Sequence, residues 1–316
     1  MPSTRDSSRG IIAMNFAMFC FISSDALVKW VTLSLPLGEA IFLRGLVAST
    51  IMAAAIAGSG DWRAWRALIE PRMGLRLVGE VGATAFYLVA LVHMPIANVT
   101  AVFQATPLVM TASAAVFLGE TVGARRWAAI AVGLVGVTII VRPGLEGFDA
   151  WSLAVLASVG FVALRDIATA RIPNGAPTGL VTFATAVSVT GLGLALRPFE
   201  AVIGRNVEWM VPDPFVGALV GLNAVALLGG YVGLLIATRL AETSAIAPFR
   251  YTLLVWSFLF GVVVFGQYPD AATLVGAAIV VATGLYAFHR ERRSRGVPPA
   301  AEADEADRDA AGIHPS

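Results

Sequence analysis

Long apolar stretches follow one another along most of this chain, and each is close to the length of a membrane-spanning helix. A helix needs about 20 apolar residues to cross the hydrocarbon core of a bilayer. Backbone polar groups in a bilayer must bond to one another, so such stretches are helical. The sequence therefore predicts an all-α integral membrane protein with ten transmembrane helices, at about 11–33, 39–58, 75–93, 96–118, 127–141, 150–170, 177–196, 214–238, 245–265 and 271–289.

The composition agrees with a membrane protein and points to no cofactor, metal or catalytic residue. Charged residues make up 14% of the chain, whereas soluble domains carry about 25%. A net charge of +1 gives no reason to expect nucleic acid as a partner. His93, His289 and His314 do not have the spacing of metal ligands. The single cysteine, Cys20, excludes a disulfide within the chain.

The distribution of Lys and Arg predicts the orientation of the chain. If residues 1–10 are cytoplasmic, sixteen basic residues fall on the cytoplasmic side, three fall outside, and three lie within spans. This bias predicts a multi-pass protein of the bacterial inner membrane with both termini cytoplasmic. Trp62 and Trp65 indicate a helix lying on the cytoplasmic surface. Residues 290–316 are charged and rich in alanine, which predicts a disordered cytoplasmic tail.

The two halves of the chain show a weak internal similarity. A shift of 141 residues places Asp25 on Asp166, and a shift of 147 places Glu120 on Gln267. These matches indicate two repeats of five spans, and an odd number of spans makes the second copy inverted in the membrane. Inverted repeats are common in secondary transporters, which bind substrate at the repeat interface. The two inverted five-helix repeats are predicted at 11–141 and 150–289.

Three charged residues within the first two spans are candidates for substrate binding or gating. Asp25 and Lys29 are four residues apart, so they share a helix face and can pair. Arg44, in the second span, stays charged and must find a partner. A charge in a span costs about 2.5–3.5 kcal/mol on insertion scales, so these side chains face a protein interior. Two interpretations stay open: the residues neutralise one another, or their excess positive charge contacts an anionic group of a substrate.

Five further side chains within the predicted spans are candidates for the same roles: Tyr87, Gln104, Arg250, Tyr251 and Trp256. The alternative for Tyr87 and Gln104 is a hydrogen bond to a neighbouring helix. Arg250 either lines the interior or extends to the membrane surface. Aromatic rings such as Trp256 either stack on a flat ligand or simply pack. Pro107 in the fourth span removes a backbone hydrogen bond, which predicts a break in that helix.

Several longer motifs identify a family resemblance. They are DALVKW in the first span, LPLGE in the following turn, FLRG in the second span, ALVHMPIANVTAVFQATPLVMTASAAVFLGE over the third and fourth, and IAVGLVGVTIIVRP in the fifth. Over about residues 10–290 the chain resembles the drug/metabolite transporter superfamily, specifically its EamA-type ten-span proteins. The second half matches less well, because Gln267 replaces the glutamate of the first repeat. The DALVK and FLR motifs look most like a bacterial subset assigned to uptake of metabolites such as S-adenosylmethionine or riboflavin.

The resemblance implies a secondary transporter that moves a small metabolite across the bacterial inner membrane by alternating access. Import of S-adenosylmethionine or riboflavin and export of amino acids or drug-like metabolites both stay open. So do coupling to a proton or a counter-substrate, and a monomeric or homodimeric state. The rivals from other classes are an intramembrane enzyme, which needs clustered acids, histidines or a nucleophile with a base, and a scaffold or sensor.

Overall fold

We describe the protein from a computed structural model over residues 4–145, 148–172, 177–203 and 208–295. Within these ranges every regular element is a helix. Ten helices are long and apolar enough to cross a membrane, which confirms the predicted all-α membrane fold: Ser8–Val31, Leu37–Ser59, Pro71–His93, Ile96–Phe117, Ala124–Val141, Trp151–Ala170, Thr178–Phe199, Pro214–Leu240, Ala247–Phe265 and Ala271–His289.

The last predicted span continues beyond its expected end, since the final helix reaches Arg295 rather than residue 289. The remainder of the predicted tail, residues 296–316, lies outside the described residues. The elements are α1 (Thr4–Val31), α2 (Leu37–Ser59), η1 (Asp61–Ile69), α3 (Pro71–His93), α4 (Ile96–Phe103), α5 (Thr106–Phe117), α6 (Ala124–Val141), α7 (Trp151–Ala170), α8 (Thr178–Leu196), η2 (Arg197–Phe199), α9 (Glu200–Ile203), α10 (Pro214–Leu240), α11 (Thr243–Ile246), η3 (Ala247–Tyr251), α12 (Thr252–Phe265) and α13 (Ala271–Arg295).

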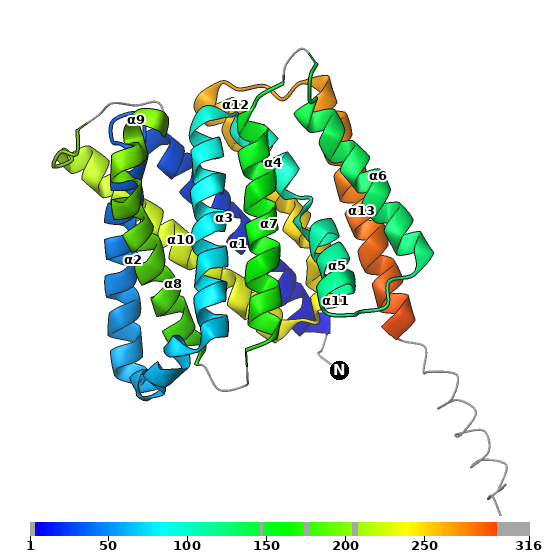
Figure 1. Cartoon of the computed structure of the whole chain (residues 1–316), viewed down its shortest axis with the longest axis horizontal. Helices are drawn as coiled ribbons and strands as arrows, with labels where there is room; N and C mark the ends of the chain where they lie inside the picture. The colour runs from blue at the N-terminus through cyan, green and yellow to red at the C-terminus, as the bar shows by residue number, and fades with distance from the viewer. Residues whose placement is uncertain (1–3, 146–147, 173–176, 204–207, 296–316) are drawn as a thin grey trace, which may run out of the picture.

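The long helices stand side by side and form a slab (Figure 1). The pair α2 and α8 lies at one end of the slab and the pair α6 and α13 at the other. Between them, α1 packs on α10 and α3 packs on α7. The start of α1 and the end of α13 lie at the same face, which we call the terminal face; the other is the opposite face.

This pairing of helices looks the same when the first five spans are exchanged for the second five. The exchange turns α1 with α10 into α7 with α3, and it leaves the two end pairs unchanged. Side-chain packing follows the same rule. A Cβ atom on Gly230 would lie 2.6 Å from the ring of Phe21, and one on Gly82 would lie 2.5 Å from the ring of Phe161. The symmetry supports two repeats, while their inverted relation stays a prediction.

The fourth and ninth spans are each interrupted within the membrane. The fourth span is split into α4 and α5 just before Pro107, which confirms the predicted break. The Thr106 hydroxyl donates to the Phe103 carbonyl oxygen at 2.5 Å. In the ninth span η3 passes into α12, and there the Thr252 hydroxyl donates to the Phe249 carbonyl oxygen at 2.6 Å. Interrupted helices at equivalent places in two repeats mark the binding region of many transporters.

A short helix, η1, connects α2 to α3 at the terminal face, where a surface helix was predicted. None of its residues is buried. Trp62 and Trp65 are 55% and 48% exposed. The ring of Trp62 also lies edge-on to Phe183 of α8, with ring centres 6.1 Å apart. The helix is therefore anchored to the bundle, and its position at the cytoplasmic membrane surface stays a prediction.

Candidate functional site

Two of the predicted residues join α1 to α3 in the half of the slab nearer the opposite face. The Tyr87 hydroxyl on α3 donates a 2.7 Å hydrogen bond to the Asp25 carboxylate on α1. The Lys29 ammonium donates to the carbonyl oxygens of Leu91 and Met94, at 2.7 and 2.5 Å. These carbonyls end α3, where helix carbonyls lack partners and the helix dipole favours a cation. Asp25 and Lys29 therefore both have hydrogen-bond partners on α3, whereas their spacing had indicated only that they can pair with each other.

Arg44 lies on α2 beside this pair, and its side chain is almost fully buried, with 5% of the residue exposed. Its guanidinium and the Asp25 carboxylate attract each other electrostatically. Across the described part of the chain, no hydrogen bond or ion pair to this guanidinium is found. We refer to Asp25, Lys29, Arg44 and Tyr87 as the opposite-side cluster.

A small cavity of about 10 Å³ adjoins Arg44 and Asn223 of α10. This is near the smallest volume that holds one water molecule. The Asn223 amide nitrogen donates to the Ser24 carbonyl oxygen at 2.6 Å. The Asn223 amide oxygen and the Ser24 hydroxyl are buried without a hydrogen-bond partner. In this conformation the space beside Arg44 admits a water molecule and no organic ligand.

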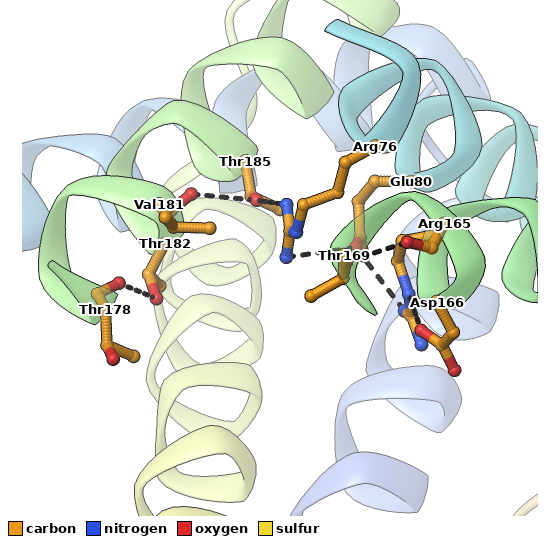
Figure 2. Close-up of polar contacts among 9 residues, drawn as sticks. All are labelled: Arg76, Glu80, Arg165, Asp166, Thr169, Thr178, Val181, Thr182 and Thr185. Atoms are coloured by element: carbon orange, nitrogen blue, oxygen red, sulfur yellow. Dashed lines mark hydrogen bonds and ion pairs between the residues drawn. The ribbon is translucent and has the colours of Figure 1, made fainter. Parts of the chain in front are cut away.

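A second set of charges lies toward the terminal face and was not among the predicted site residues (Figure 2). Glu80 of α3 is 7% exposed. Its carboxylate lies 3.4 Å from Arg165 of α7 and 3.9 Å from Arg76. Arg165 also donates to Asp166 at 2.7 Å. Arg76 reaches α8, where it donates to the Thr185 hydroxyl at 2.8 Å. We call Arg76, Glu80, Arg165 and Asp166 the terminal-side network.

A glycine allows this network to form. A Cβ atom on Gly79 would lie 2.7 Å from the backbone nitrogen of Arg165, so α3 and α7 touch at that point. The contact places Glu80, the next residue, beside Arg165. Two signals in the sequence pointed to the network: the i,i+4 spacing of Arg76 and Glu80, and the charges at 165 and 166 within a predicted span.

Two further side chains lie close to these charges. Arg250 on η3 is exposed and is attracted electrostatically to Asp166 and repelled by Arg165, with no ion pair among the described residues. Tyr231 on α10 is 41% exposed. Its hydroxyl lies within electrostatic reach of Arg44 in one cluster and of Glu80 in the other. Tyr231 is therefore within electrostatic range of both charged sets.

The other three candidates have packing contacts. The Tyr251 hydroxyl lies so close to Gly284 of α13 that no Cβ atom would fit there. The Trp256 ring lies edge-on to Phe19 of α1, with centres 5.1 Å apart. Gln104 is buried at the break between α4 and α5. Their predicted roles in binding or gating stay predictions. Among the described residues, no three His, Cys, Asp or Glu side chains are grouped to hold a metal ion.

Comparison with known proteins identifies relatives of this chain. The EamA-like transporter family matches residues 8–142. The S-adenosylmethionine uptake transporter of Rickettsia conorii is 26% identical, over 86% of this chain and 90% of that protein. The pseudopaline exporter CntI of Pseudomonas aeruginosa is 25% identical, over 86% and 93%. The riboflavin transporter of Vibrio cholerae is 27% identical, over 66% and 67%. These relatives include an uptake transporter and an exporter.

A solved structure shares the fold. One crystal structure aligns with a TM-score of 0.56 and 20% identity, over 90% of this chain and 98% of its own. Ten apolar helices and these bacterial relatives support a multi-pass protein of the inner membrane, and the relatives themselves are named as transporters of small metabolites. These matches agree with the predicted resemblance to EamA-type proteins of the drug/metabolite transporter superfamily. They indicate transporters rather than enzymes.

Proposed function

We propose that this protein is a secondary transporter that carries a small metabolite with an anionic group, such as a carboxylate, by alternating access. The observation behind the proposal is Arg44, a buried guanidinium that lacks a hydrogen-bond partner in the described part of the chain. A buried charge is costly unless another group neutralises it. A guanidinium offers a planar fork of donors that matches a carboxylate. Asp25 supplies partial compensation in the absence of substrate.

Contacts between helices on the opposite side favour a conformation closed toward that face. Asp25 and Lys29 join α1 to α3 on that side. The α4 and α12 helices also touch, and a Cβ atom on Gly261 would lie 3.4 Å from Ile96. On the terminal side Arg250 and Asp166 attract each other without an ion pair. In the alternate conformation α1 separates from α3, Arg44 becomes accessible, and Arg250 pairs with Asp166.

This chemistry discriminates between the substrates that the relatives name. S-adenosylmethionine carries a carboxylate together with cationic groups, so it offers a partner to both Arg44 and Asp25. Free amino acids offer the same two kinds of charge. Riboflavin carries no charged group, so it gives Arg44 no anionic partner. We therefore favour an amphoteric metabolite related to amino acids, with a proton or a counter-substrate as the coupling agent and the terminal face in the cytoplasm.

Uptake into proteoliposomes tests the proposal. Labelled S-adenosylmethionine, amino acids and riboflavin are supplied to the wild type, and we expect only carboxylate-bearing compounds to enter. Arg44→Gln abolishes that uptake while the protein stays folded, and Arg44→Lys restores little of it. Arg63→Gln, an exposed arginine on η1, is the matched control and transports normally. Normal transport by the double variant Asp25→Asn with Arg44→Gln would eliminate the substrate contact.

A further inference from the structure

A groove runs along the outer flank of the slab, between α6 and α13. Its volume is about 310 Å³. Most of its lining consists of small or apolar side chains, with a cation, a hydroxyl and a phenol added: Ala128, Ala129, Val132, Ala282, Thr283, Arg125 and Tyr286. The α6–α13 pair forms one end of the slab, so this flank faces the lipid (Figure 1). None of the charged groups of the two clusters borders the groove.

The groove follows from the way the two helices cross. A Cβ atom on Gly136 would lie 2.9 Å from the Gly276 carbonyl oxygen, and one on Gly276 would lie 2.6 Å from the Gly136 carbonyl oxygen. The helices touch there. At 1.5 Å per residue, Arg125 lies about 16 Å along α6 from this crossing and Tyr286 lies about 15 Å along α13. Alanines fill little of the space between, so the groove occupies the half nearer the terminal face.

The depth and charge of the lining identify the ligand chemistry. Arg125 is exposed in the first turn of α6, at the level where phospholipid headgroups lie, and no partner for it is found among the described residues. Val132, two turns deeper, is 52% exposed. Tyr286 is 46% exposed and has the amphipathic ring that suits the membrane interface. A cation at headgroup depth above an apolar groove complements a lipid that joins a negative headgroup to a hydrocarbon chain.

We propose that this groove binds an anionic phospholipid, with its phosphate at Arg125 and Tyr286 and one acyl chain along Ala128, Val132 and Ala282. The lipid supplies both the negative charge and the apolar chain that the groove lacks. A symmetric dimer through this flank would instead bring a second Arg125 into the same interface. The proposal does not depend on the identity of the transported metabolite.

Thermal unfolding of the purified full-length protein in detergent tests the site. Phosphatidylglycerol, a lipid with an anionic headgroup, is expected to raise the unfolding temperature more than phosphatidylcholine does. Arg125→Gln removes the difference between the two lipids. Ala282→Leu, or Ala282→Val if the leucine variant fails to fold, narrows the groove and removes the effect of both. Arg63→Gln is the control, since it removes an exposed arginine outside the groove and keeps the full response.

Native mass spectrometry of the same samples supplies the second readout. We expect the wild type to retain a bound phosphatidylglycerol and Arg125→Gln to retain none. Inorganic phosphate alone is expected to leave the unfolding temperature unchanged, which separates a lipid from a free anion. Three results would overturn the proposal. One is a full phosphatidylglycerol response in Arg125→Gln. The second is an equal loss of the phosphatidylglycerol response in Arg63→Gln, which would mean that surface charge in general, rather than the groove, causes the response. The third is a dimer that Ala282→Leu converts to a monomer without any lipid effect.

Discussion

At the scale of single residues, the charged groups within the membrane differ in how well they are satisfied. Asp25 has the Tyr87 hydroxyl, and Lys29 has two carbonyl oxygens of α3. Within the described chain Arg44 has longer-range electrostatic interactions, with Asp25 and Tyr231, and no hydrogen bond. A well-satisfied charge holds a structure together, whereas an under-satisfied one is ready to accept a ligand. The opposite-side cluster therefore combines two features. The hydrogen bonds of Asp25 and Lys29 hold α1 to α3, a contact that we call the latch, and Arg44 beside them is the proposed binding group.

Tyr87→Phe removes one oxygen atom and tests the latch. The Asp25 carboxylate loses its hydrogen-bond donor, and a hydrogen bond to a charged group contributes about 1.5–3 kcal/mol. We expect a loss of stability of that size in chemical or thermal unfolding. Tyr268→Phe is the matched control, because Tyr268 is 79% exposed, and it is expected to leave stability unchanged. Equal stabilities for the two variants would show that the latch contributes nothing.

Asp270→Asn tests a polar link outside the spans, between α6 and α13. Burial alone would raise the pKa of the Asp270 carboxyl, but hydrogen bonds from the Thr273 backbone N–H and from Arg142 outweigh it, so that pKa lies below its usual range. A lowered folded-state pKa gives stability that is present above the unfolded value of about 3.9 and is lost as the pH falls through the folded value.

We therefore expect Asp270→Asn to be less stable than the wild type at pH 7, by about 0.3–1 kcal/mol, the usual contribution of an anion at a helix start. The difference should shrink as the pH is lowered toward the folded-state pKa. Unfolding curves recorded between neutral and acid pH measure it. A difference that does not vary with pH would mean that the charge of Asp270 has no part in the effect.

The partners of these residues were harder to predict than the residues themselves. Local spacing on a helix identified Asp25 and Lys29, and it also indicated that the two side chains can pair with each other. The hydrogen bonds of Lys29 to α3 could not be predicted from an i,i+4 rule, because Leu91 and Met94 lie more than sixty positions away in sequence. Glu80 was missed as a site residue for the same reason, since its partner Arg165 belongs to the other half of the chain.

At the scale of elements, glycines decide where helices approach most closely. Gly82 on α3 and Gly230 on α10 each receive a phenylalanine ring from α7 and α1. A glycine inside a helix costs about 1 kcal/mol relative to alanine, so its presence here reflects packing. The break in the fourth span was predictable from Pro107, which removes a backbone hydrogen bond. Which helix meets which glycine depends on the three-dimensional arrangement and could not be read from one chain.

Gly82→Ala and Gly230→Ala are expected to destabilise the protein by similar amounts, about 1–3 kcal/mol, because the new methyl group overlaps a ring. Gly160→Ala is the control in α7, since a Cβ atom there has no neighbour within 4 Å, and it should be neutral or slightly stabilising. Unfolding measurements on the three variants give the comparison. A large effect for only one of the first two would argue against equivalent packing in the two repeats.

At the scale of the whole molecule, the ten spans were predictable because the bilayer requires long apolar helices, and their observed ends lie within a few residues of the expected ones. Orientation rests on a different principle, the bias of Lys and Arg. The structure places the start of α1 and the end of α13 on one face (Figure 1). The side of the membrane on which that face lies is still a prediction from charge.

Reporter fusions after Arg293 test this orientation. A reporter that is active only in the periplasm should be silent there, and one active in the cytoplasm should give full signal, because the basic residues of the terminal face hold it inside. The same pair of reporters fused after Arg142, at the predicted outer end of the fifth span, should give the reverse result. The same reporter result after Arg142 and after Arg293 would contradict the number of spans that is predicted between these two positions.

The end pairs of the slab have a mechanical meaning. Each of α2–α8 and α6–α13 unites one helix from either half of the chain. If the halves rock against each other, these two pairs lie on the axis of rotation, and the displacement of a residue grows with its distance from that axis. The contact between α4 and α12, which belong to different halves, would then change with a slight turn. Gly136 and Gly276, where the backbones of α6 and α13 touch, would be the point about which that pair turns.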